Sequence, residues 1–235
     1  SGTPYFFNFH VGNVGHTSIV GPHDSGKTVL THFLLAQSLK FSPHIYYLDV
    51  TGGSRKFIDK IGGTVVNFTS SGDKGTTKNR ALMNPFALRD TNGNRMFLSR
   101  WLNILARVGG YNPSDTDKIA ITNAIAHVFS LPPSERHLKP CIEFLRTHSP
   151  SWVHSTSTWH EGGAYGYVFT AEGKGIFTDQ SITSFQLHHV VTDTSLQATV
   201  ISLLLQQITD KLDGGSPSII VAAEGWRLLS QTHIA

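Results

Sequence analysis

The residues with the clearest chemical meaning form a glycine-rich loop near the start of the chain. The run Gly21-Pro22-His23-Asp24-Ser25-Gly26-Lys27-Thr28, followed by Val29, matches the pattern G-x-x-x-x-G-K-[ST]. It lies between an apolar stretch, residues 16–20, and a helical pattern over residues 29–39. In that context the loop amides and the helix N-terminus surround phosphates, the lysine reaches the outer phosphates, and the threonine hydroxyl binds Mg²⁺. The loop therefore predicts a site for ATP or GTP with magnesium.

A carboxylate at the end of another buried strand usually completes such a site, because phosphoryl transfer needs an acid to organise the metal shell and the attacking water. Residues 218–223 read as an apolar strand, and Glu224 directly follows them. We predict Glu224 and Lys27 as the catalytic residues. The position before Glu224, where the usual motif has Asp, is Ala223, which is a departure from the expected site.

The elements that must position these residues alternate between short strand patterns and longer helical patterns. This alternation predicts an α/β fold with a mostly parallel sheet. We expect strands at residues 5–10, 16–20, 45–50, 64–68, 166–169, 184–191 and 218–223. Several are apolar at consecutive positions, as strands buried on both faces tend to be.

The middle of the chain is predicted to be helical. Apolar residues recur at helical spacing between residues 97 and 108 and between residues 196 and 212. Ser114 and Asp117 resemble a capping box at the start of another helix, and Pro140 fits the first turn of a fourth. We predict one domain over residues 1–235, in which residues 95–148 form a helical insertion.

Composition sets outer limits on these predictions. The chain has 235 residues, 15% of them charged, with a formal net charge of +3, so the charge neither requires nor excludes nucleic acid. The single cysteine, Cys141, excludes an intrachain disulfide. No apolar run approaches the roughly 18 residues that span a bilayer, so we expect no integral membrane segment.

Several separated motifs resemble one family, the CagE/TrbE/VirB-type ATPases of type IV secretion and conjugation, which are relatives of the FtsK/HerA translocases. Besides the phosphate loop, the matches are residues 3–10, residues 83–86 (Met-Asn-Pro-Phe), Asn94-Arg95 with the helix after them, residues 162–166 (Gly-Gly-Ala-Tyr-Gly), and residues 224–229. They occur in the family's order over nearly the whole chain.

The resemblance implies a RecA-like P-loop core that works as a homo-oligomer, a hexamer, with other secretion components at the cytoplasmic face of the bacterial inner membrane. It implies ATP and Mg²⁺ as ligands, with Lys27 on phosphate, Thr28 on magnesium and Glu224 as the catalytic glutamate. Asp49 is a second candidate metal ligand. Because the chain stops soon after the Walker B-like strand, we expect it to lack the family's later strands. We also expect it to lack the family's N-terminal domain.

Four positions depart from the family pattern. Asp24 stands where the family has Gly, Thr51 where it has an acid, Thr170 where it has Asp, and Ala223 where it has Asp. These changes leave open a subunit that binds nucleotide but hardly hydrolyses it. A DNA translocase of the FtsK/HerA kind is a further alternative, which the charge does not favour.

Histidines and tryptophans have plainer interpretations. His188-His189, His154 and His160 match no zinc-site spacing, and the histidine pair is expected on a strand, facing opposite ways. Of the four tryptophans we expect most to be core or interface residues.

Overall fold

The computed structural model of the chain describes residues 7–10, 12, 14–68, 83–169, 180–212 and 215–228. The described chain divides into two compact units, residues 1–40 and residues 41–235. The first contains the glycine-rich loop and helix α1 (Lys27–Ser38), and the second contains the sheet and the remaining described helices.

The sheet of the second unit has four strands in the order β2-β3-β1-β4. They are β1 (His44–Asp49), β2 (Thr64–Asn67), β3 (Ile182–Gln186) and β4 (Ser218–Ala223), and every pairing is parallel. Strand β1 is central and almost continuously buried, as its sequence His-Ile-Tyr-Tyr-Leu-Asp requires. An α/β fold with a parallel sheet is therefore confirmed.

The longer helices of the second unit are α3 (Asn92–Val108), α4 (Asp115–Ser130), α5 (Leu138–His148) and α8 (Thr194–Lys211). The shorter ones are α2 (Arg55–Lys60), α6 (Pro150–Ser155), α7 (His188–Thr192) and α9 (Gly225–Leu228), and 3₁₀ turns occur at Leu39–Phe41, Pro85–Ala87, Pro133–Glu135 and Ser157–Trp159. Helices α3 to α5 occupy the predicted helical insertion. Ser114 and Asp117 form the capping box that the sequence indicated.

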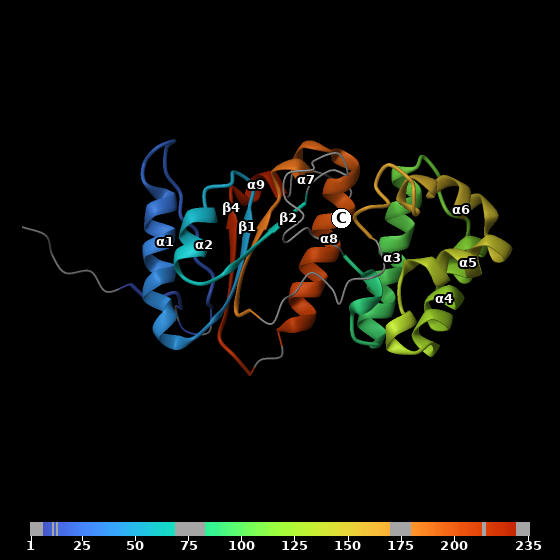
Figure 1. Cartoon of the computed structure of the whole chain (residues 1–235), viewed down its shortest axis with the longest axis horizontal. Coiled ribbons are helices and arrows are strands. Elements are labelled where there is room, and N and C mark those ends of the chain that lie inside the picture. Colours follow the sequence, from blue (N-terminus) through green and yellow to red (C-terminus); the bar gives the residue numbers. More distant parts are fainter. Residues whose placement is uncertain are drawn as a thin grey trace, which may run out of the picture. The chain divides into compact units, whose positions relative to one another are not determined.

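Helix α8 lies between the sheet and the helical region that contains α3 to α6 (Figure 1). One continuous hydrophobic core joins the three parts, with Leu48 and Phe185 from the sheet, Val200 from α8 and Leu102 from α3 among its members. The core includes Trp101, Trp152 and Trp159, whereas Trp226 is 72% exposed.

Three strand predictions were wrong in the described residues. Residues 16–20 form no β-ladder, and the described part of residues 5–10 forms none either. Residues 166–169 are turns, because the Gly166 amide bonds back to the Gly163 carbonyl at 3.1 Å.

The strand predicted over residues 184–191 ends early. Strand β3 stops at Gln186, and α7 follows with His188 and His189 on it. The β-branched residues at 190–192 favoured a strand on propensity alone, but packing decides such short segments.

Candidate functional site

The glycine-rich loop has the backbone conformation that its sequence pattern requires. Asp24 and Gly26 both have positive φ, 58° and 80°, and α1 begins directly after Gly26. Glycine adopts this region freely, and aspartate is one of the few other residues that tolerate it. Asp24 therefore keeps the backbone shape at a position where the related family has Gly.

Lys27 folds back over the loop. Its Nζ donates to the Gly21 carbonyl at 2.9 Å and to the Pro22 carbonyl at 2.5 Å. Ser25 Oγ closes the same turn by donating to the Pro22 carbonyl at 2.8 Å. A Cβ at Gly21 would approach Ser25 Oγ to 2.7 Å, so the Ser25 side chain would have to move to accept one. The Lys27 ammonium group is thus bonded to neutral carbonyls of the loop, which are weaker acceptors than a phosphate.

The N-terminus of α1 fits a phosphate. No side chain caps it in the described structure, and its first turn contains no acidic residue. The first amides of a helix have no partner within the helix, and they carry the positive end of its dipole. Thr28, the predicted magnesium residue, is exposed in this first turn. These features together provide donors and a hydroxyl for a phosphate–magnesium ligand.

Asp24 adds a negative charge to this loop. Its carboxylate pairs with His23 Nδ1 at 2.9 Å, and both side chains are about nine-tenths exposed. An exposed pair contributes little to stability. Asp24 opposes an incoming polyphosphate electrostatically unless His23 or a metal ion neutralises it.

Asp49 lies at the carboxyl end of β1 and is 1% exposed. Its Oδ1 accepts from the amides of Thr51 and Gly52, at 3.0 and 2.8 Å, and its Oδ2 accepts from the amide and hydroxyl of Ser54, at 2.8 and 2.5 Å. Gln186 Nε2 also donates to Oδ2, at 3.2 Å. Burial alone would raise the pKa of Asp49, but these hydrogen bonds hold that pKa below its usual value. Both oxygens are committed to the protein, so Asp49 fits a structural role better than a metal site.

Glu224, which follows β4, differs from Asp49 in backbone conformation, exposure and hydrogen bonding. Its φ is 51°, an unusual conformation for a non-glycine residue. Its side chain is 42% exposed, and its carboxylate lies 3.4 Å from Arg227 Nη1. Backbone strain of this kind costs about 1–3 kcal/mol and occurs preferentially at functional sites. The strained position is an independent reason to consider Glu224 functional.

The structure places the two acids at one edge of the sheet. Strands β1 and β4 are neighbours, and Asp49 is opposite Ala223 in their register, so Glu224 follows one residue later. The loop residues, Gly21 to Val29, belong to the first unit. Of the other departures from the family pattern, Thr51 bonds to Asp49, while Thr170 lies outside the described residues.

No group of three or more His, Cys, Asp or Glu in the described part of the chain is arranged to hold a metal ion. Mg²⁺ suits the loop nonetheless, because it commonly binds through one or two protein oxygens together with substrate phosphates and waters. Thr28 is the described side chain that fits this role. Likewise, no helix of the described residues is long and apolar enough to cross a membrane.

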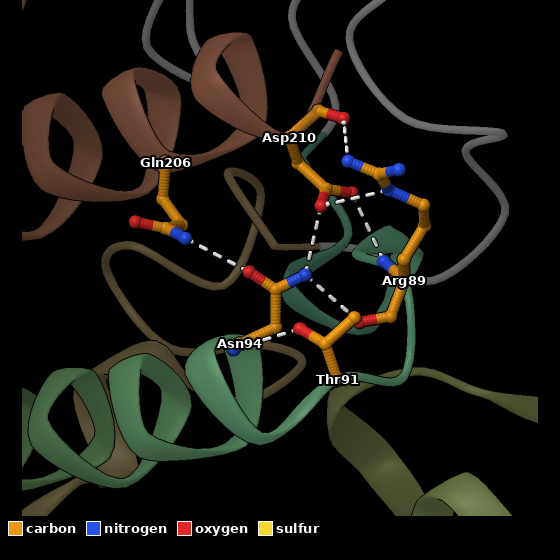
Figure 2. Close-up of polar contacts among 5 residues, drawn as sticks. All are labelled: Arg89, Thr91, Asn94, Gln206 and Asp210. Atoms are coloured by element: carbon orange, nitrogen blue, oxygen red, sulfur yellow. Dashed lines mark hydrogen bonds and ion pairs between the residues drawn. The ribbon is translucent and has the colours of Figure 1, made fainter. Parts of the chain in front are cut away.

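The motif residues 83–95 join parts of the fold. The Asn84 side chain accepts from the Phe86 amide at 3.0 Å and donates to the Arg136 carbonyl at 2.8 Å. Asn94 Nδ2 donates to Asp210 Oδ1 of α8 at 2.8 Å, and Arg89 Nε donates to the same carboxylate at 3.0 Å (Figure 2). Asn84 thus bonds to the segment between α4 and α5, and Arg89 and Asn94 bond to α8.

The sequence analysis missed the polar residues that support the acids. Ser54, Ser184 and Gln186 surround Asp49, and Ser184 Oγ lies 2.8 Å from Ser54 Oγ. A signal was present, because β3, with the sequence Ile-Thr-Ser-Phe-Gln, has more polar than apolar residues, which is unusual for an interior strand of a parallel sheet. Gln197, a buried amide on α8, gave a similar signal beside Leu196 and Val200.

Comparisons with known proteins were made for the sequence and for the fold. No protein-family model matches the chain. The type IV secretion system protein virB4 of Bartonella quintana is 28% identical over 230 residues, which cover 97% of this chain and 28% of that protein. The protein virB4 of Agrobacterium fabrum is 29% identical over 222 residues, which cover 91% of this chain and 27% of that protein.

The fold is similar to that of a solved structure, VirB4 of Thermoanaerobacter pseudethanolicus. The TM-score is 0.66 at 15% identity, and the match covers 88% of this chain and 60% of that one. The chain spans little more than a quarter of the length of the curated relatives named above. The resemblance that the separated motifs indicated is confirmed: over most of its length the chain is similar in sequence, at 27–29% identity, to VirB4 proteins of type IV secretion systems.

Proposed function

We propose that this chain is the nucleotide-binding part of a P-loop ATPase that energises type IV secretion or conjugative transfer. The main support for the proposal is the loop at residues 21–28. Asp24 and Gly26 have left-handed backbone conformations, Lys27 bonds to the loop carbonyls, and no side chain caps the N-terminus of α1 in the described structure. The VirB4 relatives support the biological setting.

In this proposal each residue has a distinct task. Lys27 leaves the carbonyls of Gly21 and Pro22 and neutralises charge on the outer phosphate, while the first amides of α1 bind the inner phosphates. Thr28 contributes its hydroxyl to Mg²⁺, which when bound neutralises phosphate charge. Glu224 accepts a proton from the attacking water.

The resemblance also supports a setting for the motor. We propose a homo-oligomer, a hexamer, that associates with other secretion components at the cytoplasmic face of the inner membrane. Its activity then depends on protein concentration, because neighbouring subunits complete such sites.

A nucleotide-binding subunit that hardly hydrolyses ATP is the second candidate. Ala223 removes the acid before Glu224, and the residue opposite it, Asp49, has both carboxylate oxygens occupied by hydrogen bonds. Asp24 adds a negative charge at the loop. Weaker organisation of the metal would lower the rate more than the affinity.

Magnesium-dependent ATP binding and phosphate release, measured together over a range of protein concentrations, test both candidates. Lys27→Ala should reduce phosphate release about 100-fold or more, because a cation on the transferred phosphoryl group is lost. Lys56→Ala, an exposed cation of α2, is the control.

The outcomes separate the candidates. Release that is lost in Lys27→Ala and kept in Lys56→Ala supports the ATPase. Binding without release, with partial release gained in Ala223→Asp, supports the nucleotide-binding subunit. Equal affinity and equal rate in wild type and Lys27→Ala would contradict the whole assignment.

A further inference from the structure

The position of Glu224 depends on its backbone. Its carboxylate has a long contact with Arg227, at 3.4 Å, and its φ of 51° is a conformation that surrounding structure must maintain. The turn that follows is short, since α9 has four residues and begins with the Arg227 amide bonded to the Glu224 carbonyl at 2.9 Å. Such a turn does not stabilise itself.

Gln197 of α8 is bonded to this turn. Its side chain is 1% exposed, and its Nε2 donates to the Arg227 carbonyl at 2.7 Å and to the Leu228 carbonyl at 3.4 Å. The last carbonyls of a helix have no partner within the helix, so an amide from another element satisfies them. Gln197 thereby caps α9 from outside.

Helix α8 is a fixed support for this contact at its N-terminal half. Its N-cap Asp193 accepts from the Tyr165 hydroxyl at 2.9 Å, which ties the start of α8 to the segment after the helical region. The Trp101 indole donates to the carbonyl of Thr199, two residues after Gln197, at 2.9 Å.

The C-terminal end of α8 is held as well. Figure 2 shows Asp210 between Arg89 and Asn94, with Gln206 donating to Asn94 at 2.8 Å. Burial would raise the pKa of Asp210, but the bonds from Arg89 and Asn94 keep that pKa below its ordinary value. With both ends bonded, α8 offers Gln197 a defined position.

We propose that Gln197 is a positioning residue for Glu224: it holds the carbonyls of Arg227 and Leu228 on α8 and so keeps the strained Glu224 backbone in place. This rests on the proposed role of Glu224. Gln197 touches no reacting atom in this scheme and acts through the turn.

The test uses two variants of nearly equal shape that lose the donor. Gln197→Met has no polar head group, and an ionised Gln197→Glu presents only acceptors. Gln207→Met is the matched control, since Gln207 is also a buried amide of α8, 5% exposed, and donates to the Asn84 carbonyl at 2.8 Å, away from the turn. Having two replacements keeps the test valid if one of them fails to fold.

Amide hydrogen exchange over residues 218–228 is the first readout, and it needs no enzymatic activity. Loss of a buried hydrogen bond to the turn should speed exchange there about fivefold to tenfold. Gln207→Met should leave exchange at this segment unchanged. The proposal would be overturned if the Gln197 variants exchanged these amides at the wild-type rate, or if Gln207→Met raised the exchange rate there as much as they do.

Nucleotide kinetics are the second readout. A misplaced Glu224 should lower kcat about tenfold or more while ATP affinity stays as in wild type, because the phosphate loop is untouched. A loss of affinity equal to the loss of rate would point to a general structural defect and overturn the positioning role. If the wild-type chain itself releases no phosphate, the proposed hydrolysis fails, while the exchange result still decides whether Gln197 holds the turn.

Discussion

The ends of two neighbouring strands, β1 and β4, treat their carboxylates in opposite ways. Asp49 at the end of β1 is fully enclosed, and amides and hydroxyls of residues 51–54 bond to both its oxygens. Glu224 after β4 is 42% exposed, has a strained backbone and has one long contact with Arg227. The first carboxylate is enclosed by the loop that follows it, and the second is accessible to solvent.

This difference teaches that the end of a parallel strand is not by itself a functional position. The sequence placed Asp49 and Glu224 in equivalent contexts, each an acid after an apolar strand. What separates them is the hydrogen bonding by the following residues. Thr51, Gly52 and Ser54 donate to Asp49, whereas Glu224 has a long contact with Arg227, at 3.4 Å, and its side chain is 42% exposed.

Removing the enclosed carboxylate should have the largest effect. Asp49→Ala leaves the buried amide and hydroxyl of Ser54 without their acceptor and also removes the acceptor of the partly buried Gly52 amide, so we expect a loss of about 3 kcal/mol or more in the free energy of unfolding. Urea unfolding followed by circular dichroism measures it. Asp49→Asn, which keeps one acceptor oxygen, should lose less; equal stability of wild type and Asp49→Ala would remove the structural role.

A third carboxylate, Asp117, is also enclosed. The pH dependence of the free energy of unfolding can show whether it stabilises the fold. Burial would raise its pKa, but bonds from Ser149, Ser114 and Tyr111 lower that pKa to about 2. Its contribution is therefore complete above the unfolded-state pKa of about 4 and is lost as pH falls toward 2.

Between about pH 5 and pH 2 the wild type should lose roughly 2 kcal/mol more than Asp117→Asn does. Unfolding midpoints at several pH values measure this difference, since the other acids titrate alike in both proteins. Parallel pH profiles would show that the Asp117 pKa is not lowered in the folded chain.

Glu224→Gly should have the smallest effect on stability and the opposite sign. Glycine adopts positive φ without strain, so the unfolding free energy should rise by about 1 kcal/mol. Phosphate release should nevertheless be lost. As a control, Glu224→Gln keeps the strained backbone and should leave stability unchanged while it also lowers the rate. Destabilisation by glycine would mean that the backbone at Glu224 carries no strain.

Much of the sheet could be predicted because burial and periodicity act locally. Strand β4 was placed with its observed bounds, and β1 and β2 were placed within a residue or so, since runs such as residues 45–48 are apolar at consecutive positions. The capping box of α4 could also be predicted, because Ser114 and Asp117 are only three residues apart and bond to each other's backbone amides.

What could not be predicted depends on contacts that are distant in sequence. Residues 16–20 look like a strand, yet a strand exists only with a partner, and they form no ladder. Asp49 looked like a metal ligand, and one of its donors, Gln186, comes next to it only when β1 and β3 are paired. The conformation of the glycine-rich loop could be predicted because its pattern is contained in consecutive residues.

The strand order also constrains how the protein is made. Strand β1 pairs with β3 and β4, which the ribosome delivers only after the entire helical region. Until then the apolar β1 has no ladder to join, whereas α3, α4 and α5 can pack against one another at once. The described pairings of β1 can therefore form only after β3 and β4 have been synthesised, and the apolar residues of β1 lack these two partners while the helical region is being made.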